Sequence, residues 1–238
     1  MDTRQYHEVL ETQGVRAGPS SEPGIGGSFA WPFRGRWQGP WAIGLALVLL
    51  LPLTFILLLG YAVGATRAAA KAPSDGPPPW PPVGRLLADG LSAAVAIALL
   101  TLPFALAATL LSAPLSSPAL WHSTDPLLHV EGWTVAILIA ALPWGIVLLL
   151  LMPHATARFA ATRRVRHFFD FAASLRSVRR DFASWNIAVA AIVTAWALGL
   201  ACVGLLCIGL VPGFFYAILV SAHATATLHP EGEDPSAR

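Results

Sequence analysis

The sequence predicts an all-α, polytopic helical membrane protein with about five membrane segments and one amphipathic interfacial helix. Of its 238 residues, 55% are hydrophobic and only 12% are Asp, Glu, Lys or Arg, which is about half the charged share of soluble domains. The mean hydropathy of +0.63 excludes a chain that is disordered throughout. The few charged residues are also clustered, so that long stretches of the chain carry none.

The charge-free stretches define the predicted membrane segments. They cover 37–66, 90–124, 132–157 and 182–230. A membrane-spanning helix needs about 20 apolar residues, so each stretch holds one segment. The last stretch is long enough for two, and the break between them is supplied by Gly204, Gly209, Pro212 and Gly213. The predicted segments lie near 41–63, 89–112, 133–152, 185–203 and 210–227.

Prolines lie near the middle of three of these segments. Pro52, Pro103 and Pro143 predict kinked or broken helices, which a bilayer tolerates where neighbouring groups satisfy the freed carbonyls. The whole helical membrane domain is predicted over 29–228. Residues 1–28 are polar and rich in Gly, Ser and Pro, which predicts a mobile tail, and 229–238 form a short acidic tail.

Residues 153–185 form the most strongly charged part of the chain. Aromatic and aliphatic residues recur there at three- and four-residue steps, which predicts a basic amphipathic helix. This apolar face is formed by Phe168, Phe171, Leu175, Val178, Phe182 and Trp185. It either lies in the membrane surface or packs against the protein's own spans, and the pattern fits both. The candidate contacts to anionic lipid or to a partner protein are Arg163, Arg164, Arg166, Arg176, Arg179 and Arg180.

The distribution of basic residues predicts the topology. Four lie before residue 41, three in 64–88, none in 113–132, seven in 153–185 and one at the end. Basic loops favour the cytoplasm. If 41–63 breaks at Pro52 and returns to the side it entered from, all fifteen basic residues are cytoplasmic. If 41–63 crosses the membrane instead, as its length of 23 residues permits, the N-terminal segment lies outside.

A series of short motifs runs from the first apolar segment into the second. It consists of Gly60-Tyr61, Arg67, Pro79-Trp80, Asp89-Gly90 and Pro103. In their order and spacing these residues resemble the prokaryotic membrane family known as domain of unknown function 4013, over about residues 29–228. The resemblance implies a multi-pass protein of a prokaryotic cell membrane. It implies no activity, because none is established for the family.

We expect no enzymatic activity, no cofactor and no metal site. The sequence contains no nucleophile elbow, phosphate loop or metalloprotease helix. His122, Asp125, His129 and Glu131 lie within ten residues, but their spacing matches no metal signature, and we interpret them as solvated loop residues. Within the predicted segments the ionisable side chains lie near the ends, which disfavours proton-coupled transport.

Two functional hypotheses remain. The first is a non-enzymatic scaffold or accessory subunit with a basic cytoplasmic membrane-surface helix, whose partners are the lipid bilayer with its anionic lipids and another membrane protein. The alternative is a permease or channel-like protein for a small neutral or lipidic solute. A polar cavity at the membrane midplane, lined by Thr54, Ser92, Thr101 or Thr194, would favour transport. No nucleic acid is expected as a partner.

Overall fold

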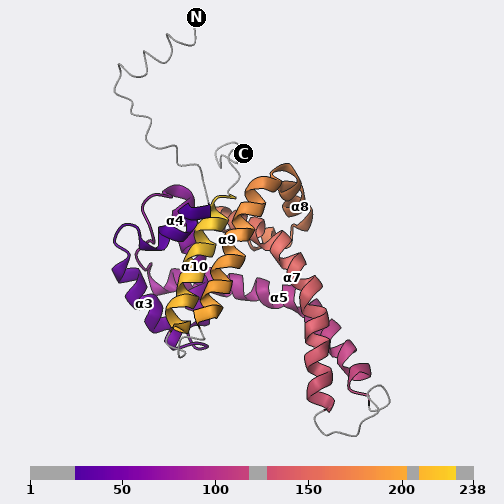
Figure 1. Cartoon of the computed structure of the whole chain (residues 1–238). Coiled ribbons are helices and arrows are strands. Elements are labelled where there is room, and N and C mark those ends of the chain that lie inside the picture. Colours follow the sequence, from indigo (N-terminus) through magenta and orange to yellow (C-terminus); the bar gives the residue numbers. More distant parts are fainter. Residues whose placement is uncertain (1–24, 118–127, 203–208, 229–238) are drawn as a thin grey trace, which may run out of the picture.

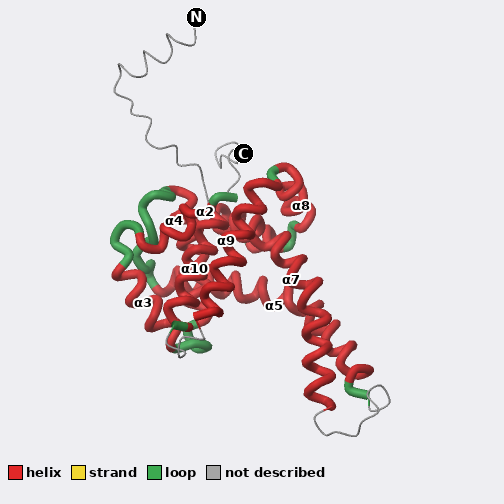
Figure 2. Tube along the Cα trace, in the orientation of Figure 1, coloured by secondary structure: helices red, strands yellow, loops and turns green. Residues whose placement is uncertain are grey.

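The computed structural model describes residues 25–117, 128–202 and 209–228. Every regular element in these ranges is a helix, which confirms the predicted all-α class (Figures 1 and 2). The elements are α2 (Ile25–Ala30), the 3-10 helix η1 (Trp31–Phe33), α3 (Gln38–Leu49), α4 (Phe55–Lys71), α5 (Val83–Leu115), α7 (Leu128–Thr162), the 3-10 helix η2 (Val165–Phe168), α8 (Phe171–Arg180), α9 (Phe182–Ala201) and α10 (Leu210–Ala226).

Three helices are long and apolar enough to cross a membrane. They are α5, the part of α7 from Val130 to Thr162, and α9. The predicted segments 89–112, 133–152 and 185–203 fall on these helices, so the chain is a membrane protein. The predicted segment 210–227 corresponds to α10, a shorter apolar helix of 17 residues.

The first predicted segment, 41–63, is divided into two helices. α3 ends at Leu49 and α4 begins at Phe55, with Pro52 in the turn between them. The hydroxyl of Thr54 donates a hydrogen bond to the carbonyl of Leu47 across this turn. The helix break predicted at Pro52 is therefore present.

The two ends of this helical hairpin lie together. Gly35 precedes α3 and Gly76 follows α4, and both have positive φ angles, of 59° and 82°. A methyl group on Gly35 would overlap the carbonyl oxygen of Asp75, and one on Gly76 would overlap that of Arg34. The chain thus returns after α4 to the place where it began before α3, which is the geometry that the re-entrant alternative requires.

The longest elements, α5 and α7, form an antiparallel pair. Asp89 of α5 lies beside Arg163, just after α7, and at the far end a methyl group on Gly132 of α7 would overlap Ser116. Each helix is about 50 Å long at 1.5 Å per residue, against a hydrocarbon thickness near 30 Å. In Figure 1 this pair extends to the lower right, beyond α3, α9 and α10. Both helices continue through Pro103 and Pro143, where the sequence predicts a kink or a break.

The basic amphipathic helix predicted within 153–185 is present as α8, but it is shorter than the apolar pattern from Phe168 to Trp185 suggests. Residues 153–162 complete α7, η2 and α8 follow, and α9 begins at Phe182. Two aspartates start the new helices, because Asp170 accepts a hydrogen bond from the amide of Ala173 and Asp181 accepts one from the amide of Ser184, each at 3.1 Å. Hydrogen bonds from the side chain and backbone of Ser184 also lower the pKa of Asp181.

The predicted tail ends too late. Residues 1–24 and 229–238 lie outside the described part of the chain, but 25–28 belong to α2. The buried hydroxyl of Ser28 lies 3.0 Å from Nδ1 of His223 near the end of α10. α2 is therefore held by a residue 195 positions away in the sequence, and no local sequence pattern predicts this contact.

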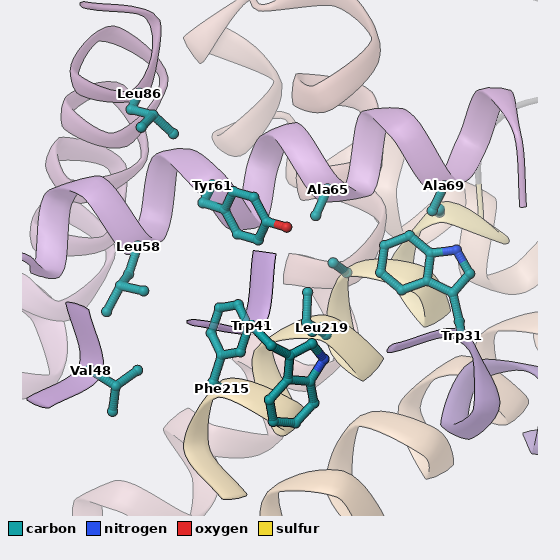
Figure 3. Packing of buried hydrophobic residues seen from close by; sticks show 12 residues of the cluster. Trp31, Trp41, Val48, Leu58, Tyr61, Ala65, Ala69, Leu86, Phe215 and Leu219 are labelled. Carbon is teal, nitrogen blue, oxygen red and sulfur yellow. The ribbon is translucent and has the colours of Figure 1, made fainter. Parts of the chain in front are cut away.

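The main core lies between α4 and α10. Tyr61 of α4 stacks on Phe215 of α10 at a centroid distance of 6.0 Å, and Trp41 of α3 contacts the same ring edge-on at 5.5 Å. Figure 3 shows these rings together on one side of α4, while Leu86 of α5 lies on the other. α4 is therefore enclosed between α10 on one face and α5 on the opposite face.

The crossing of α4 and α5 depends on two glycines. A methyl group on Gly60 would overlap the backbone carbonyl of Leu86, and one on Gly90 would overlap that of Ile56. The two helix backbones are thus in direct contact, which only residues without a side chain permit.

We predict that Gly60→Ala separates these helices and lowers stability by about 1 to 3 kcal/mol, the usual cost of overpacking. Gly64→Ala is the matched control on the same helix, because a methyl group there meets nothing within 4 Å. SDS titration of the purified protein should show an earlier unfolding midpoint for Gly60→Ala and an unchanged or later one for Gly64→Ala. Equal midpoints for the two variants would contradict the close crossing.

Candidate binding pocket

A pocket of about 390 Å³ lies beside the crossing of α4 and α5. The C-terminal half of α4 forms one wall, the start of α5 forms another, and the extended segment Pro78–Pro82 forms the third. This volume is within the range of small-molecule sites. The close contact at Gly60 and Gly90 holds together the two helices that form the first two walls.

The third wall is held by an aromatic stack. The rings of Tyr61 and Trp80 are nearly parallel, with centroids 3.9 Å apart. The Tyr61 hydroxyl donates to the carbonyl of Pro78 at 2.9 Å, and the Trp80 indole N–H donates to the carbonyl of Pro40 at 3.1 Å. Because prolines have a fixed φ, this connector needs little further ordering. The wall is consequently formed without a ligand.

Asp89 links three helical segments through two arginines. Its Oδ2 lies 3.2 Å from Nη1 of Arg67 on α4, and its Oδ1 lies 3.8 Å from Nε of Arg163, just after α7. Arg67 also donates from Nε to the carbonyl of Ala160 at 2.7 Å. Its Nη2 is enclosed and has no hydrogen-bond partner among the described residues.

The pocket carries more positive than negative charge. Arg67, Lys71 and Arg85 line it together with a single carboxylate, Asp89. Lys71 and Arg85 are exposed, and neither forms an ion pair with a described residue. The remaining lining is apolar or aromatic apart from the Tyr61 hydroxyl. Such a pocket suits a ligand with a negative charge and an apolar body.

Most of the motif residues singled out in the sequence meet at this pocket. Those that line it are Gly60, Tyr61, Arg67, Pro79, Trp80 and Asp89. Gly90 lies at the helix crossing beside it. Pro103 lies within α5, fourteen residues beyond Asp89, and does not line the pocket.

The predicted arginine cluster is divided between two places. Arg163 reaches Asp89, whereas the exposed residues on and before α8 are Arg164, Arg166, Arg176, Arg179 and Arg180. Arg158 in α7 pairs with Asp170 at 3.5 Å and thereby connects α7 to the start of α8.

The predicted apolar face of this region is divided as well. Phe168 is buried against Phe159 at a centroid distance of 4.7 Å, and Val178 is also buried. Phe171 and Phe182 are 44% and 60% exposed. Part of the apolar face therefore packs on the protein's own helices and part faces outward.

Sequence reasoning missed Lys71 and Arg85 as pocket residues. The available signal was their position on either side of the proline-rich connector 72–82. Their convergence depends on the crossing of α4 and α5, which no sequence spacing encodes. Of the predicted outer-loop residues, His122 and Asp125 lie outside the described part of the chain, and nothing is described of the His129 side chain.

We predict that Asp89→Asn destabilises the protein by about 2 to 3 kcal/mol, because it leaves the Arg67 guanidinium enclosed without its counter-charge. Arg163→Gln removes the outer partner, whose side chain is 50% exposed, and should cost less than about 1 kcal/mol. SDS titration of both variants in the same detergent checks the order. A larger loss for Arg163→Gln would contradict the assignment of Arg67 as the main partner.

Comparison with known proteins gives a family and no named relative. No curated protein and no solved structure shows a significant match to the chain. The model of the family described as "Protein of unknown function (DUF4013)" matches residues 43–220, a range that includes both helices of the pocket and all the motif residues. This match covers well over half of the chain and confirms the resemblance, and the protein belongs to the DUF4013 family.

Proposed function

We propose that this protein is a non-enzymatic scaffold or accessory subunit of a prokaryotic cell membrane, whose basic end lies on the cytoplasmic leaflet and binds its anionic lipids. The observation that carries the proposal is the position of positive charge along the three span-length helices. Arg85 is at the start of α5, Arg158 is near the end of α7, and α8 with its arginines precedes α9. These three helix ends belong to one end of the molecule.

The opposite helix ends carry no basic residue. No Lys or Arg occurs between Arg85 and Arg158 or between Arg180 and Arg238. Helix ends rich in Lys and Arg favour the cytoplasmic side, which supports the assignment of 153–185 to the cytoplasm. The segregation also supports placing the outer loop 113–132 on the other side.

The α3–α4 hairpin fits a segment that enters the membrane and returns to the basic end. Its tip is apolar and outward-facing, with Leu49 and Leu53 69% and 88% exposed. Within the turn, the amides of Leu51 and Leu53 donate to the carbonyls of Val48 and Leu50. These bonds lower the cost of free backbone groups, which is the main physical objection to a break within lipid.

The surface around α8 has the chemistry of a membrane interface. The aromatic rings of Phe169, Phe171 and Phe182 are exposed, and so are Arg176, Arg179 and Arg180. Aromatic side chains beside arginines suit the boundary between acyl chains and anionic headgroups. Near such a leaflet each basic residue contributes on the order of 1 kcal/mol.

Transport receives no comparable support. The hydroxyls of Ser92 and Thr101 donate to the backbone carbonyls of Ala88 and Ile97 within α5, and that of Thr54 donates to Leu47. None of these residues lines the pocket beside α4. We therefore do not propose a solute pathway.

The topology predicts which cysteines an impermeant reagent labels in intact cells. In a background with Cys202 and Cys207 replaced by Ala, Glu131→Cys on the outer side should be labelled. Gln38→Cys, at the exposed start of α3, should be labelled only after permeabilisation, because a crossing segment would place it outside. Labelling of Gln38→Cys in intact cells would contradict the re-entrant hairpin, and failure to label Glu131→Cys would contradict the orientation as a whole.

Lipid contact predicts that α8 senses the bilayer charge. We expect an environment-sensitive dye on Ala172→Cys, in the same cysteine-free background, to shift its emission to the blue in nanodiscs with phosphatidylglycerol compared with phosphatidylcholine. Replacing Arg176, Arg179 and Arg180 by Glu should abolish the shift, and high salt should weaken it. Replacing the same three by Lys keeps the charge and should preserve it. An identical shift in the Glu variant would refute lipid binding by α8.

A further inference from the structure

The pocket beside α4 is separate from the α8 surface, and the proposed function makes no use of it. Its lining residues come from α4, from the segment Pro78–Pro82 and from the start of α5. Its wall is already ordered by the Tyr61–Trp80 stack and by the two hydrogen bonds to Pro78 and Pro40. A preformed pocket loses less entropy when a ligand binds.

The charges of the pocket indicate an anionic ligand. Arg67 and Lys71 are four residues apart on α4 and share one helix face, and Arg85 faces them from α5. Asp89 already neutralises Arg67 at 3.2 Å, so that Lys71 and Arg85 are the cations without a counter-charge among the described residues. Two uncompensated cations at one pocket repel each other and favour a group with oxygens that accept from both.

The position of the pocket indicates where such a ligand comes from. It lies at the first two turns of α5, the helix that continues as a membrane span to Leu115. The start of a span is at the level of the lipid headgroups. Gly60, Ala68, Leu86 and the proline-rich wall supply apolar surface for the glycerol and upper acyl atoms.

We propose that this pocket binds the phosphate headgroup of one anionic phospholipid, with Lys71 and Arg85 as its charged contacts and the Trp80 wall against its glycerol region. The site is distinct from the diffuse contact around α8, since it has a defined volume and its own lining residues, and it should bind one lipid. It shares with the proposed function only the membrane location. A soluble phosphate compound would satisfy the same cations without the apolar wall, and the experiment separates the two sources.

Native mass spectrometry of the full chain, released from a nonionic detergent with phosphatidylglycerol added, tests the proposal. We expect a one-to-one lipid adduct, with phosphatidylcholine bound at least tenfold more weakly because its choline cancels the phosphate charge. Lys71→Glu with Arg85→Glu should reduce phosphatidylglycerol binding tenfold or more. Both side chains are exposed, so the fold should persist, which an unchanged SDS unfolding midpoint checks.

Two further variants locate the site. Gly64→Leu keeps every charge and places a side chain in open space at the pocket wall, because a methyl group there meets nothing within 4 Å, and it should reduce the adduct as strongly. The Glu variant of Arg176, Arg179 and Arg180 should leave the adduct unchanged. This α8 variant also separates the two proposals, because lipid binding at the pocket can fail while lipid binding by α8 holds, and the reverse.

Three results would overturn the proposal. If the Lys71→Glu, Arg85→Glu variant binds phosphatidylglycerol as strongly as the wild type, these two residues are not the charged contacts of the lipid. Loss of the adduct in the α8 variant alone would assign the lipid to the other surface. Displacement of phosphatidylglycerol by inorganic phosphate at equal concentration would assign the pocket to a soluble phosphate ligand instead of a lipid.

Discussion

The direct contact between the backbones of α4 and α5 is the constraint on which the rest of the structure depends. Gly60 and Gly90 permit it, since a single methyl group at either position would overlap the other helix. The contact brings Arg67 within 3.2 Å of Asp89 and places Lys71 and Arg85 at one pocket. It also leaves the opposite face of α4 free for Phe215 of α10. One close crossing thus positions the core, the ion pair and the candidate site.

The membrane imposes the second constraint, the separation of charge. An uncompensated charge is costly in hydrocarbon. The basic residues of α5 and α7, and those of α8 before α9, accordingly lie at one end of the three span-length helices. At that end the charges serve different purposes. Arg67 and Arg163 join helices through Asp89, whereas Arg176, Arg179 and Arg180 face outward. Some of the basic residues that cluster in the sequence therefore hold helices together, and the others lie on the surface.

The parts of the fold that follow from composition could be predicted, and those that follow from distant contacts could not. Hydropathy located the three span-length helices, because burying apolar residues in lipid acts on each segment separately. The break at Pro52 was also predicted, since proline removes a backbone donor and disfavours a helix interior, whereas α5 and α7 continue through Pro103 and Pro143. The amphipathic helix within 153–185 is shorter than its apolar pattern because Asp170 and Asp181 accept from nearby backbone amides and start the separate helices α8 and α9. The burial of Ser28 against His223 had no local signal.

By itself, the sequence determined that the protein is helical, resides in a membrane and keeps its basic residues away from the long apolar stretches, because hydrophobicity and charge act locally along the chain. The tertiary structure decided which of those residues meet. Tyr61 and Trp80 are 19 positions apart and Arg67 and Asp89 are 22 apart, yet each pair is in contact. Such distances cannot be read from spacing, because they depend on how closely two helix backbones approach, and here two glycines set that approach.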